Sequence, residues 1–246
     1  MDWTPPENPD PSKIIDEVPL EISARNFEVA LAKLVWFHYN ALRLQPSLYG
    51  VRLSFALGYW KELADLHPPA LASLKQVRDA AEISIRNRDL SGDALRDAFH
   101  DFEAINKKLN ESHRTKDLFI WLDTSNPDAG NAQRFYRIAQ PALLQAREYR
   151  FCGKFIHAQD MFDWSLKRFN EKKHLAEDPK YGINLRAFGE KSFTNEVAIL
   201  VALLAINDRE DEAARVASDA LTEFEDADFE KLLEAAMGGS VPEPWP

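Results

Sequence analysis

The sequence predicts an all-α protein, built as an irregular, α-solenoid-like array of antiparallel helical hairpins with little or no β-sheet. Apolar residues recur at three- and four-residue spacing along most of the chain from Ser23 onward, which is the period of an amphipathic helix. No run of alternating Val, Ile or Thr bounded by turn residues occurs, so strands are not expected. Short turns separate the periodic segments, and such short connections favour antiparallel neighbours.

The first part of the chain is expected to contain a proline-rich arm followed by five helices. Prolines at positions 5, 6, 9, 11 and 19 exclude a regular helix from the arm, which covers residues 1–22. Pro46 ends the first helix, Pro68 fits the first turn of the third, and Ser91 can cap the fourth. The expected helices cover residues 23–45, 47–66, 68–88, 92–109 and 114–122.

The second part of the chain is expected to contain six helices and a tail. These helices cover residues 132–146, 149–157, 160–173, 194–206, 210–224 and 229–237. Turn-forming residues in "EDPKYGIN" and "AFGEKS" mark a longer loop in the middle of this part. We therefore expect a single all-helical domain over residues 23–238, which the loop can subdivide near 175–193. Residues 239–246 form the expected tail.

Two segments share the shape of a helical hairpin with small residues at its helix contacts. "TNEVAILVALLAINDREDEAARVASDALTEF" places Ala213 and Ala220 seven residues apart in its second helix, and "PALLQAREYRFCGKFI" places Cys152 similarly. These segments resemble the tetratricopeptide-like helical hairpin, in which small residues let paired helices approach closely. The family's usual glycine, large aromatic residue and terminal proline are absent, and the chain has no strict repeat period. The resemblance implies an α-solenoid-like fold and a protein-binding function.

The formal net charge of -10 is concentrated near the ends of the chain. Residues 207–234 hold 11 acidic side chains against three basic ones, whereas the long middle of the chain is slightly basic. Affinity for phosphate backbones comes from clustered Lys and Arg, so this pattern argues against a nucleic-acid partner. A basic protein partner fits the acidic end. We expect Glu223, Asp226 and Glu230 to lie on one exposed surface that binds it.

The chain shows neither a membrane-spanning segment nor a secretory signal. Its longest apolar run, Val197 to Ile206, is half the length of about 20 residues that a membrane helix needs, so we expect a buried helix. The first 13 residues lack a basic stretch and an apolar stretch. A single cysteine cannot form an internal disulfide, which fits a reducing compartment. We therefore expect a cytoplasmic protein without a membrane partner.

The single cysteine, Cys152, is interpreted as a packing residue. His157 is five residues further along, and on a helix the two side chains would point roughly 140° apart, too far for a nucleophile and its base. Buried cysteine behaves as a small apolar residue. Cys152 and Gly153 together would give the helix a surface of small side chains, which suits close packing against a neighbouring helix. We expect the thiol to be buried and inert.

Tryptophan positions indicate two roles. Trp36, Trp60, Trp121 and Trp164 lie in helical apolar patterns and are expected in the core. Trp3 and Trp245 lie among prolines near the two ends of the chain. Burial of these two side chains would hold the terminal segments against the body.

His100 and Glu103 share one face of a predicted helix, and an imidazole and a carboxylate three residues apart can ligate a metal in a helical bundle. The same face carries Arg96 and Lys107, which would repel a cation, and no second pair of this kind completes a di-metal site. We therefore expect no metal and no cofactor. Both side chains are expected to be exposed to solvent.

The function expected from the sequence is a non-enzymatic protein-binding module, in a sharper form an inhibitor or immunity-type protein that neutralises a basic partner. The alternative is a metal-independent ribonuclease. Helical ribonucleases of the HEPN type use an arginine and a histidine about four to six residues apart, and two pairs resemble that arrangement. They are Arg150 with His157 and Arg168 with His174. Such an enzyme needs one pair together in a concave pocket.

Overall fold

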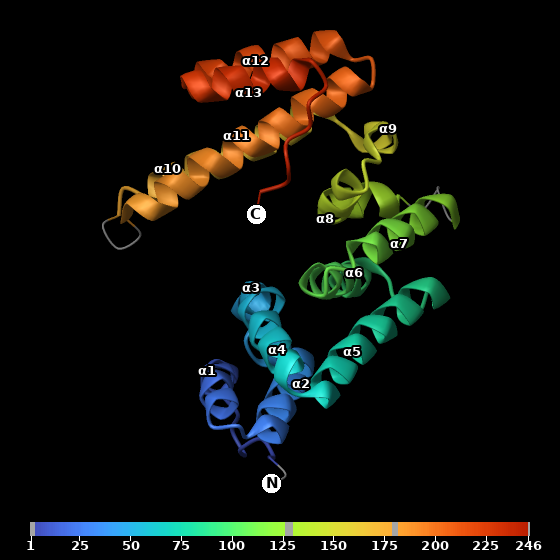
Figure 1. Cartoon of the computed structure of the whole chain (residues 1–246), viewed down its shortest axis with the longest axis vertical. Helices are drawn as coiled ribbons and strands as arrows, with labels where there is room; N and C mark the ends of the chain where they lie inside the picture. Colours follow the sequence, from blue (N-terminus) through green and yellow to red (C-terminus); the bar gives the residue numbers. More distant parts are fainter. Residues whose placement is uncertain (1–2, 126–129, 179–181, 246) are drawn as a thin grey trace. The chain divides into compact units, whose positions relative to one another are not determined.

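The all-α class is confirmed by the computed structural model, which describes residues 3–125, 130–178 and 182–245. All regular elements in these residues are helices, and no strand occurs among them. Contacts divide the chain into two compact units, Met1–Ala139 and Gln140–Pro246 (Figure 1). Within the described ranges, none of the helices combines the length and apolar character that a bilayer crossing requires.

The first unit is a series of consecutive helices joined by short connections. The strongest packing is between chain neighbours, namely α1 with α2, α4 with α5, and α5 with α6. Its elements are α1 (Pro11–Ser23), α2 (Phe27–Leu44), the 3-10 turn η1 (Pro46–Leu48), α3 (Tyr49–Leu53), α4 (Phe55–Leu66), α5 (Pro68–Asn87), α6 (Gly92–Lys108) and α7 (Ser112–Ser125). The unit ends within α8 (Asn131–Gln145).

The exclusion of helix from residues 1–22 was wrong, because α1 lies there. Pro11 occupies the first turn, where its missing N–H costs nothing, and Asp10 caps the helix by accepting from the N–H groups of Ser12 and Lys13. Pro19 does lie inside the helix, at a cost of about 3 kcal/mol. Burial of four aliphatic side chains offsets it at about 1.5–3 kcal/mol each. These are Ile14, Ile15, Val18 and Ile22.

The core of the first unit lies between α1, α2, α4 and α5. Leu34, Phe37 and Leu63 are fully enclosed there, and Trp60 is 1% exposed. The indole N–H of Trp60 donates to the carbonyl of Ala70 at 3.1 Å, so its polar edge is satisfied. The expectation of a core position is therefore confirmed for Trp60. It is wrong for Trp164 of the second unit, which is 40% exposed.

The second unit is organised around one long helix, α11 (Gly182–Ile206), which packs against four other helices (Figure 1). These are α9 (Tyr149–Cys152), α10 (Ala158–Leu175), α12 (Glu210–Glu223) and α13 (Ala227–Met237), and the 3-10 turn η3 (Gly153–Phe155) follows α9. Every residue from Val197 to Leu204 is buried, which confirms the buried helix expected from this apolar run.

Helix α11 also corrects the expected loop. The sequence "AFGEKS" was assigned to it, yet these residues are helical. The side chain of Lys172, on α10, packs over Gly189. A Cβ added to Gly189 would stand 3.1 Å from the Cβ of Lys172. Glycine here lets the two helices approach closely, so it is a packing residue instead of a turn signal.

The boundary between the two contact units falls within α8. The subdivision near residues 175–193 stays a prediction. A single domain over residues 23–238 stays a prediction. Residues 1–2, 179–181 and 246, which belong to the expected arm, loop and tail, lie outside the described residues.

Candidate functional site

The three acidic residues expected to bind a partner lie on the α12–α13 hairpin of the second unit, and all three are exposed. Glu223 is the last residue of α12, Asp226 precedes α13, and Glu230 lies in its first turn. The hairpin is packed against the rest of the unit, because one face of each of its helices is buried. Those faces are formed by Ala213, Val216 and Ala220 and by Phe229, Leu233 and Ala236.

Asp226 has a local structural role that the sequence analysis missed. Its carboxylate accepts hydrogen bonds from the N–H groups of Asp228 (3.1 Å) and Phe229 (2.8 Å), so it is the N-cap of α13. Asp228 and Glu230 then lie in the first turn, where the helix dipole favours negative charge. Asp226, Asp228 and Glu230 are therefore at a helix start, where negative charge is favourable. Glu223 differs from them, because it is the last residue of α12, where the helix dipole disfavours negative charge.

Some carboxylates of this region are paired and others are not. Asp228 accepts from Lys231 at 3.2 Å, and Glu212 from Arg209 at 2.6 Å. Glu223 and Glu230 have no cation within 4 Å among the described residues. The exposed hairpin therefore carries uncompensated negative charge.

Arg150 and His157, the first candidate ribonuclease pair, are both exposed. The guanidinium of Arg150 donates to Asp208 at 2.5 Å instead of approaching the histidine. His157 stands at the N-terminal boundary of α10. The partner that the structure gives Arg150 is therefore a carboxylate, and a catalytic role for this pair stays a prediction.

Arg168 and His174, the second pair, also have separate partners. Arg168 donates to Glu196 at 3.0 Å and lies 4.2 Å from the ring centre of Trp164. His174 is exposed and lies 3.2 Å from a carboxylate oxygen of Glu177. Each arginine of the two candidate pairs thus neutralises a carboxylate.

Cys152 is fully buried, as expected. Gly153, the small residue next to it, packs against Asn207 at the end of α11. Asn207 donates from its amide to the carbonyl of Tyr149 at 3.1 Å, which ties α9 to this helix end. His157 is exposed, in keeping with a packing role for the thiol.

A buried polar cluster in the first unit was missed by the sequence analysis. Asp101 on α6 accepts from the guanidinium of Arg52 at 2.9 Å, and Nε2 of His38 lies 4.0 Å from the same carboxylate oxygen. The Tyr49 hydroxyl lies 3.2 Å from Asp97 and 3.0 Å from Nδ1 of His100. Tyr49 donates its one hydroxyl proton to Asp97, so it accepts from Nδ1–H of His100.

The pKa values in this cluster are displaced by burial. Burial, with a smaller contribution from the charge of Arg52, lowers the pKa of His38 to about 3. Burial raises the pKa of Asp101 to about 6 against the opposing effect of Arg52. At neutral pH His38 is therefore uncharged, and its contact with Asp101 is not an ion pair. Burial likewise lowers the pKa of His100 and raises that of Tyr49 to about 12.

A cleft of about 390 Å³ opens beside this cluster. Small residues of α5 and α6 line it, together with the polar side chains of His38, Arg52 and Asp101. The full lining is His38, Tyr39, Leu42, Arg52, Val77, Ala80, Ala81, Ser84, Leu90, Ala94, Asp97, Ala98 and Asp101. Arg52 and Asp101 compensate each other's charge inside the cluster. The pKa of Asp101, about 6, means that this carboxyl group changes its protonation state near pH 6. The network thereby joins α2, α3 and α6.

The expectation that His100 and Glu103 are exposed was wrong, since both are half-buried. His100 is held by Tyr49, and burial raises the pKa of Glu103 to about 7, opposed by Lys107. The spacing of Asp97, His100 and Asp101, at three and four residues, was the available signal. The partners of these three α6 side chains come from residues 38–52, and local spacing does not reveal them.

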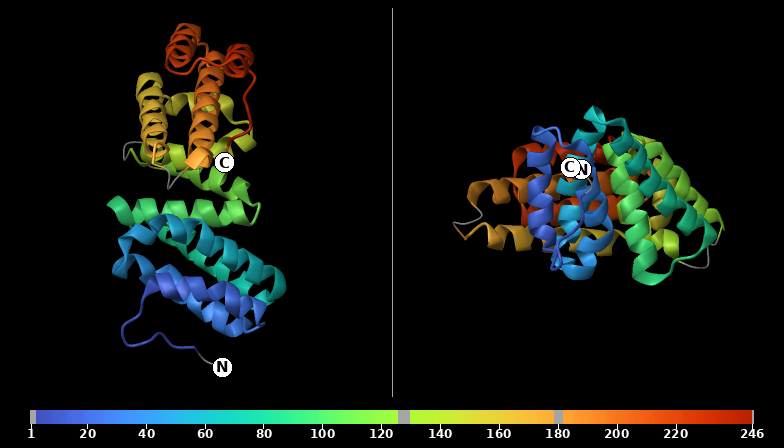
Figure 2. Two further views of the ribbon diagram at one scale, coloured as in Figure 1. Left: turned by 90° about the vertical axis from the view of Figure 1, so that its left-hand side faces the viewer. Right: turned by 90° about the horizontal axis from the view of Figure 1, so that it is seen from below.

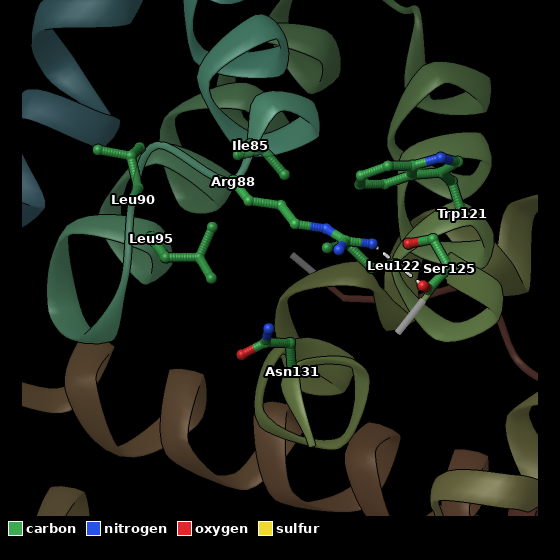
Figure 3. A pocket seen from close by; sticks show the side chains of 8 residues that line it. All are labelled: Ile85, Arg88, Leu90, Leu95, Trp121, Leu122, Ser125 and Asn131. Atoms are coloured by element: carbon green, nitrogen blue, oxygen red, sulfur yellow. Dashed lines mark hydrogen bonds between the residues drawn. The ribbon is translucent and has the colours of Figure 1, made fainter. Parts of the chain in front are cut away.

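Two further clefts lie in the first unit. The smaller, of about 200 Å³, has an apolar wall that includes Ile85, Leu95 and Trp121 (Figure 3). Arg88 crosses it and donates to the carbonyl of Ser125 at 3.1 Å, at the end of α7 (Figure 3). The other is an open apolar groove of about 560 Å³ along α2, where Trp3 packs edge-on against Trp36 at 6.2 Å. Trp3 thus holds the N-terminal segment, as expected.

Comparison with known proteins gives no relative: no family model, no curated protein and no solved structure matches this chain.

Proposed function

We propose that this chain is a non-catalytic protein-binding module, of the inhibitor or immunity type, that binds a basic partner through Glu223, Asp226 and Glu230. We call these three residues the acidic surface. The observation that carries the proposal is the exposure of Glu223 and Glu230 without a compensating cation among the described residues. Uncompensated like charges on one hairpin repel each other, and a basic partner would relieve this repulsion on binding.

Its scaffold suits this role. Glu223 and Glu230 flank the turn of a hairpin whose apolar faces are buried, so the carboxylates stand on rigid elements. Ala213 and Ala220 are fully buried in α12, as in the tetratricopeptide-like hairpin that the sequence resembles. Members of that family commonly bind other proteins, which supports the proposal by analogy. A cytoplasmic location belongs to the same proposal.

The ribonuclease alternative receives no support from the described residues. Arg150 and Arg168 each bond a carboxylate, and His157 and His174 are exposed. A catalytic pair would instead share a concave, partly desolvated site.

The decisive experiment reverses charge without disturbing the helix cap. Glu223→Lys with Glu230→Lys changes the acidic surface and leaves Asp226 in place. The matched control, Glu7→Lys with Glu62→Lys, makes the same charge change at exposed positions of the first unit. Each protein is used as bait in lysate from the source organism. Proteins retained by the wild type and the control, and lost with the reversal variant, are then purified.

Association rates with the purified partner complete the test. The reversal variant should associate about tenfold more slowly or worse, since steering depends on complementary charge. The wild-type rate should fall as salt rises, because exposed charges are screened beyond about 8 Å at physiological ionic strength. Equal rates for wild type, control and reversal variant, or a rate indifferent to salt, would refute the proposal.

A further inference from the structure

The chain reverses direction after α13 and runs back beside α11 (Figure 2). Gly239 makes the reversal at φ +83°, a left-handed conformation that favours glycine. The N–H groups of Gly239 and Ser240 donate to the carbonyls of Ala236 (2.8 Å) and Ala235 (3.0 Å), which ends the helix. Residues 240–245 then form a segment without regular structure, which we call the C-terminal segment.

Asn195 of α11 binds the backbone of this segment with both ends of its amide. Its Nδ2 donates to the carbonyl of Glu243, and its Oδ1 accepts from the N–H of Trp245, both at 2.9 Å. Pro244 lies between these two contacts, where an absent N–H leaves no donor unsatisfied. The recognition uses main-chain groups only, so it does not depend on the side chain at position 243.

Trp245 supplies the side-chain anchor. Its ring centre lies 4.9 Å from that of Phe188, and the ammonium group of Lys191 lies 4.9 Å from the indole ring. Phe188, Lys191 and Asn195 occur at positions i, i+3 and i+7, so they share one face of α11. Aromatic packing and a cation over an indole contribute roughly 0.5–1.5 kcal/mol each. This face of α11 therefore binds both the backbone of the segment and its tryptophan side chain.

We infer that Phe188, Lys191 and Asn195 form a binding site for an extended, proline-flanked tryptophan segment of a partner protein, which the C-terminal segment occupies in cis. The chemistry of the bound segment defines the class of ligand, namely a residue followed by proline and tryptophan. Proline favours the extended conformation before binding and so lowers the entropic cost. This inference is independent of the acidic surface, which lies on other helices.

The C-terminal segment of the same chain must leave the site before a partner segment can bind there. A short connection keeps it at an effective concentration on the order of millimolar, so a separate peptide competes poorly with the intact segment. Removal of the Trp245 side chain should release the site while the fold remains. Trp245 is only half-buried, and its loss leaves the core of the unit intact.

The test uses the full chain and a fluorescein-labelled peptide with the sequence of residues 239–246. Fluorescence polarisation should show that Trp245→Ala binds the peptide at least tenfold more tightly than the wild type does. Adding Asn195→Ala to that variant should weaken binding at least tenfold, as should replacing the peptide's tryptophan with alanine. Circular dichroism checks that each variant is folded, and Trp245→Leu replaces Trp245→Ala should the latter unfold.

Three results would overturn the inference. The first is a folded Trp245→Ala chain that does not bind the peptide at 1 mM, on the order of the effective concentration of the cis segment. The second is equal binding with and without Asn195. The third is a concentration-dependent dimer of the wild type that Trp245→Ala abolishes, because the occupant would then be the segment of a second copy.

Discussion

Gly153 lies directly against the side chain of Asn207. A Cβ on Gly153 would stand 2.2 Å from the amide oxygen of Asn207, closer than any real contact between such atoms. Asn207 cannot withdraw freely, because its amide nitrogen donates to the carbonyls of Tyr149 (3.1 Å) and Leu203 (2.7 Å). The absence of a side chain at position 153 therefore allows α9 and η3 to pack against the end of α11.

Gly153→Ala should destabilise the protein by about 1–3 kcal/mol, the usual cost of overpacking. The backbone at Gly153 is in the ordinary right-handed region, φ -53°, so strain does not contribute. Urea unfolding measures the effect. Gly58→Ala is the control, because Gly58 lies within α4 with nothing near its missing Cβ. This control should stabilise by roughly 0.5–1 kcal/mol, since alanine is the better helix former.

A double-mutant cycle identifies the cause. Asn207→Ala alone loses two hydrogen bonds, but in the Gly153→Ala background it also removes the clash. The two changes should therefore cost less together than the sum of their separate effects, by at least about 0.5 kcal/mol. Strict additivity would show that the contact does not explain the cost.

Cys152→Ala should lower the free energy of unfolding by roughly 1 kcal/mol, the typical cost of a core truncation this small. The thiol is fully buried, so a thiol reagent should label the folded protein much more slowly than the protein in urea. Mass spectrometry after brief exposure to the reagent measures both rates. Rapid labelling of the folded chain would contradict a packing role.

Asp226→Ala should destabilise α13 by about 1 kcal/mol, because it removes the cap that accepts from Asp228 and Phe229. Glu225→Ala removes the same charge from the neighbouring exposed residue and should change stability by less than about 0.5 kcal/mol. Thermal unfolding compares the two variants. Equal effects would mean that net charge, and not the cap, determines the loss.

Periodicity was sufficient to predict the helices because most of them bury one face, as α6 does with Leu95, Phe99 and Phe102. It failed at Pro19, where tertiary burial of α1 outweighs the cost of a proline inside a helix. It failed again at Gly189, because a packing glycine and a turn glycine look alike in one sequence.

The polar cluster could not be predicted for a different reason. Asp101 meets Arg52 and His38 only after α2, α3 and α6 have packed, and no local spacing encodes that meeting. The acidic surface was visible from composition, yet the cap at Asp226 depends on where α13 begins. A boundary shift of one or two residues decides whether an acid is at a helix end or a helix start.

Glu103 provides the last prediction, which concerns pH. Burial raises its pKa from 4.5 to about 7, with Lys107 opposing the shift. The folded state therefore binds this proton more tightly than the unfolded state does, so stability is lost as pH rises from about 4.5 to 7. Glu103→Gln removes the titration. The variant should be more stable than the wild type by about 1–3 kcal/mol at pH 8, and this advantage should shrink toward pH 4.5.

Urea unfolding at pH 4.5, 6, 7 and 8 measures the difference between the two proteins at each pH. Glu62→Gln, at an exposed position of α4, is the control and should stay within about 0.5 kcal/mol of the wild type throughout. The sign of the trend is the critical result. A Glu103→Gln advantage that grows as pH falls, or one that is constant with pH, would show that burial does not disfavour the ionised carboxylate.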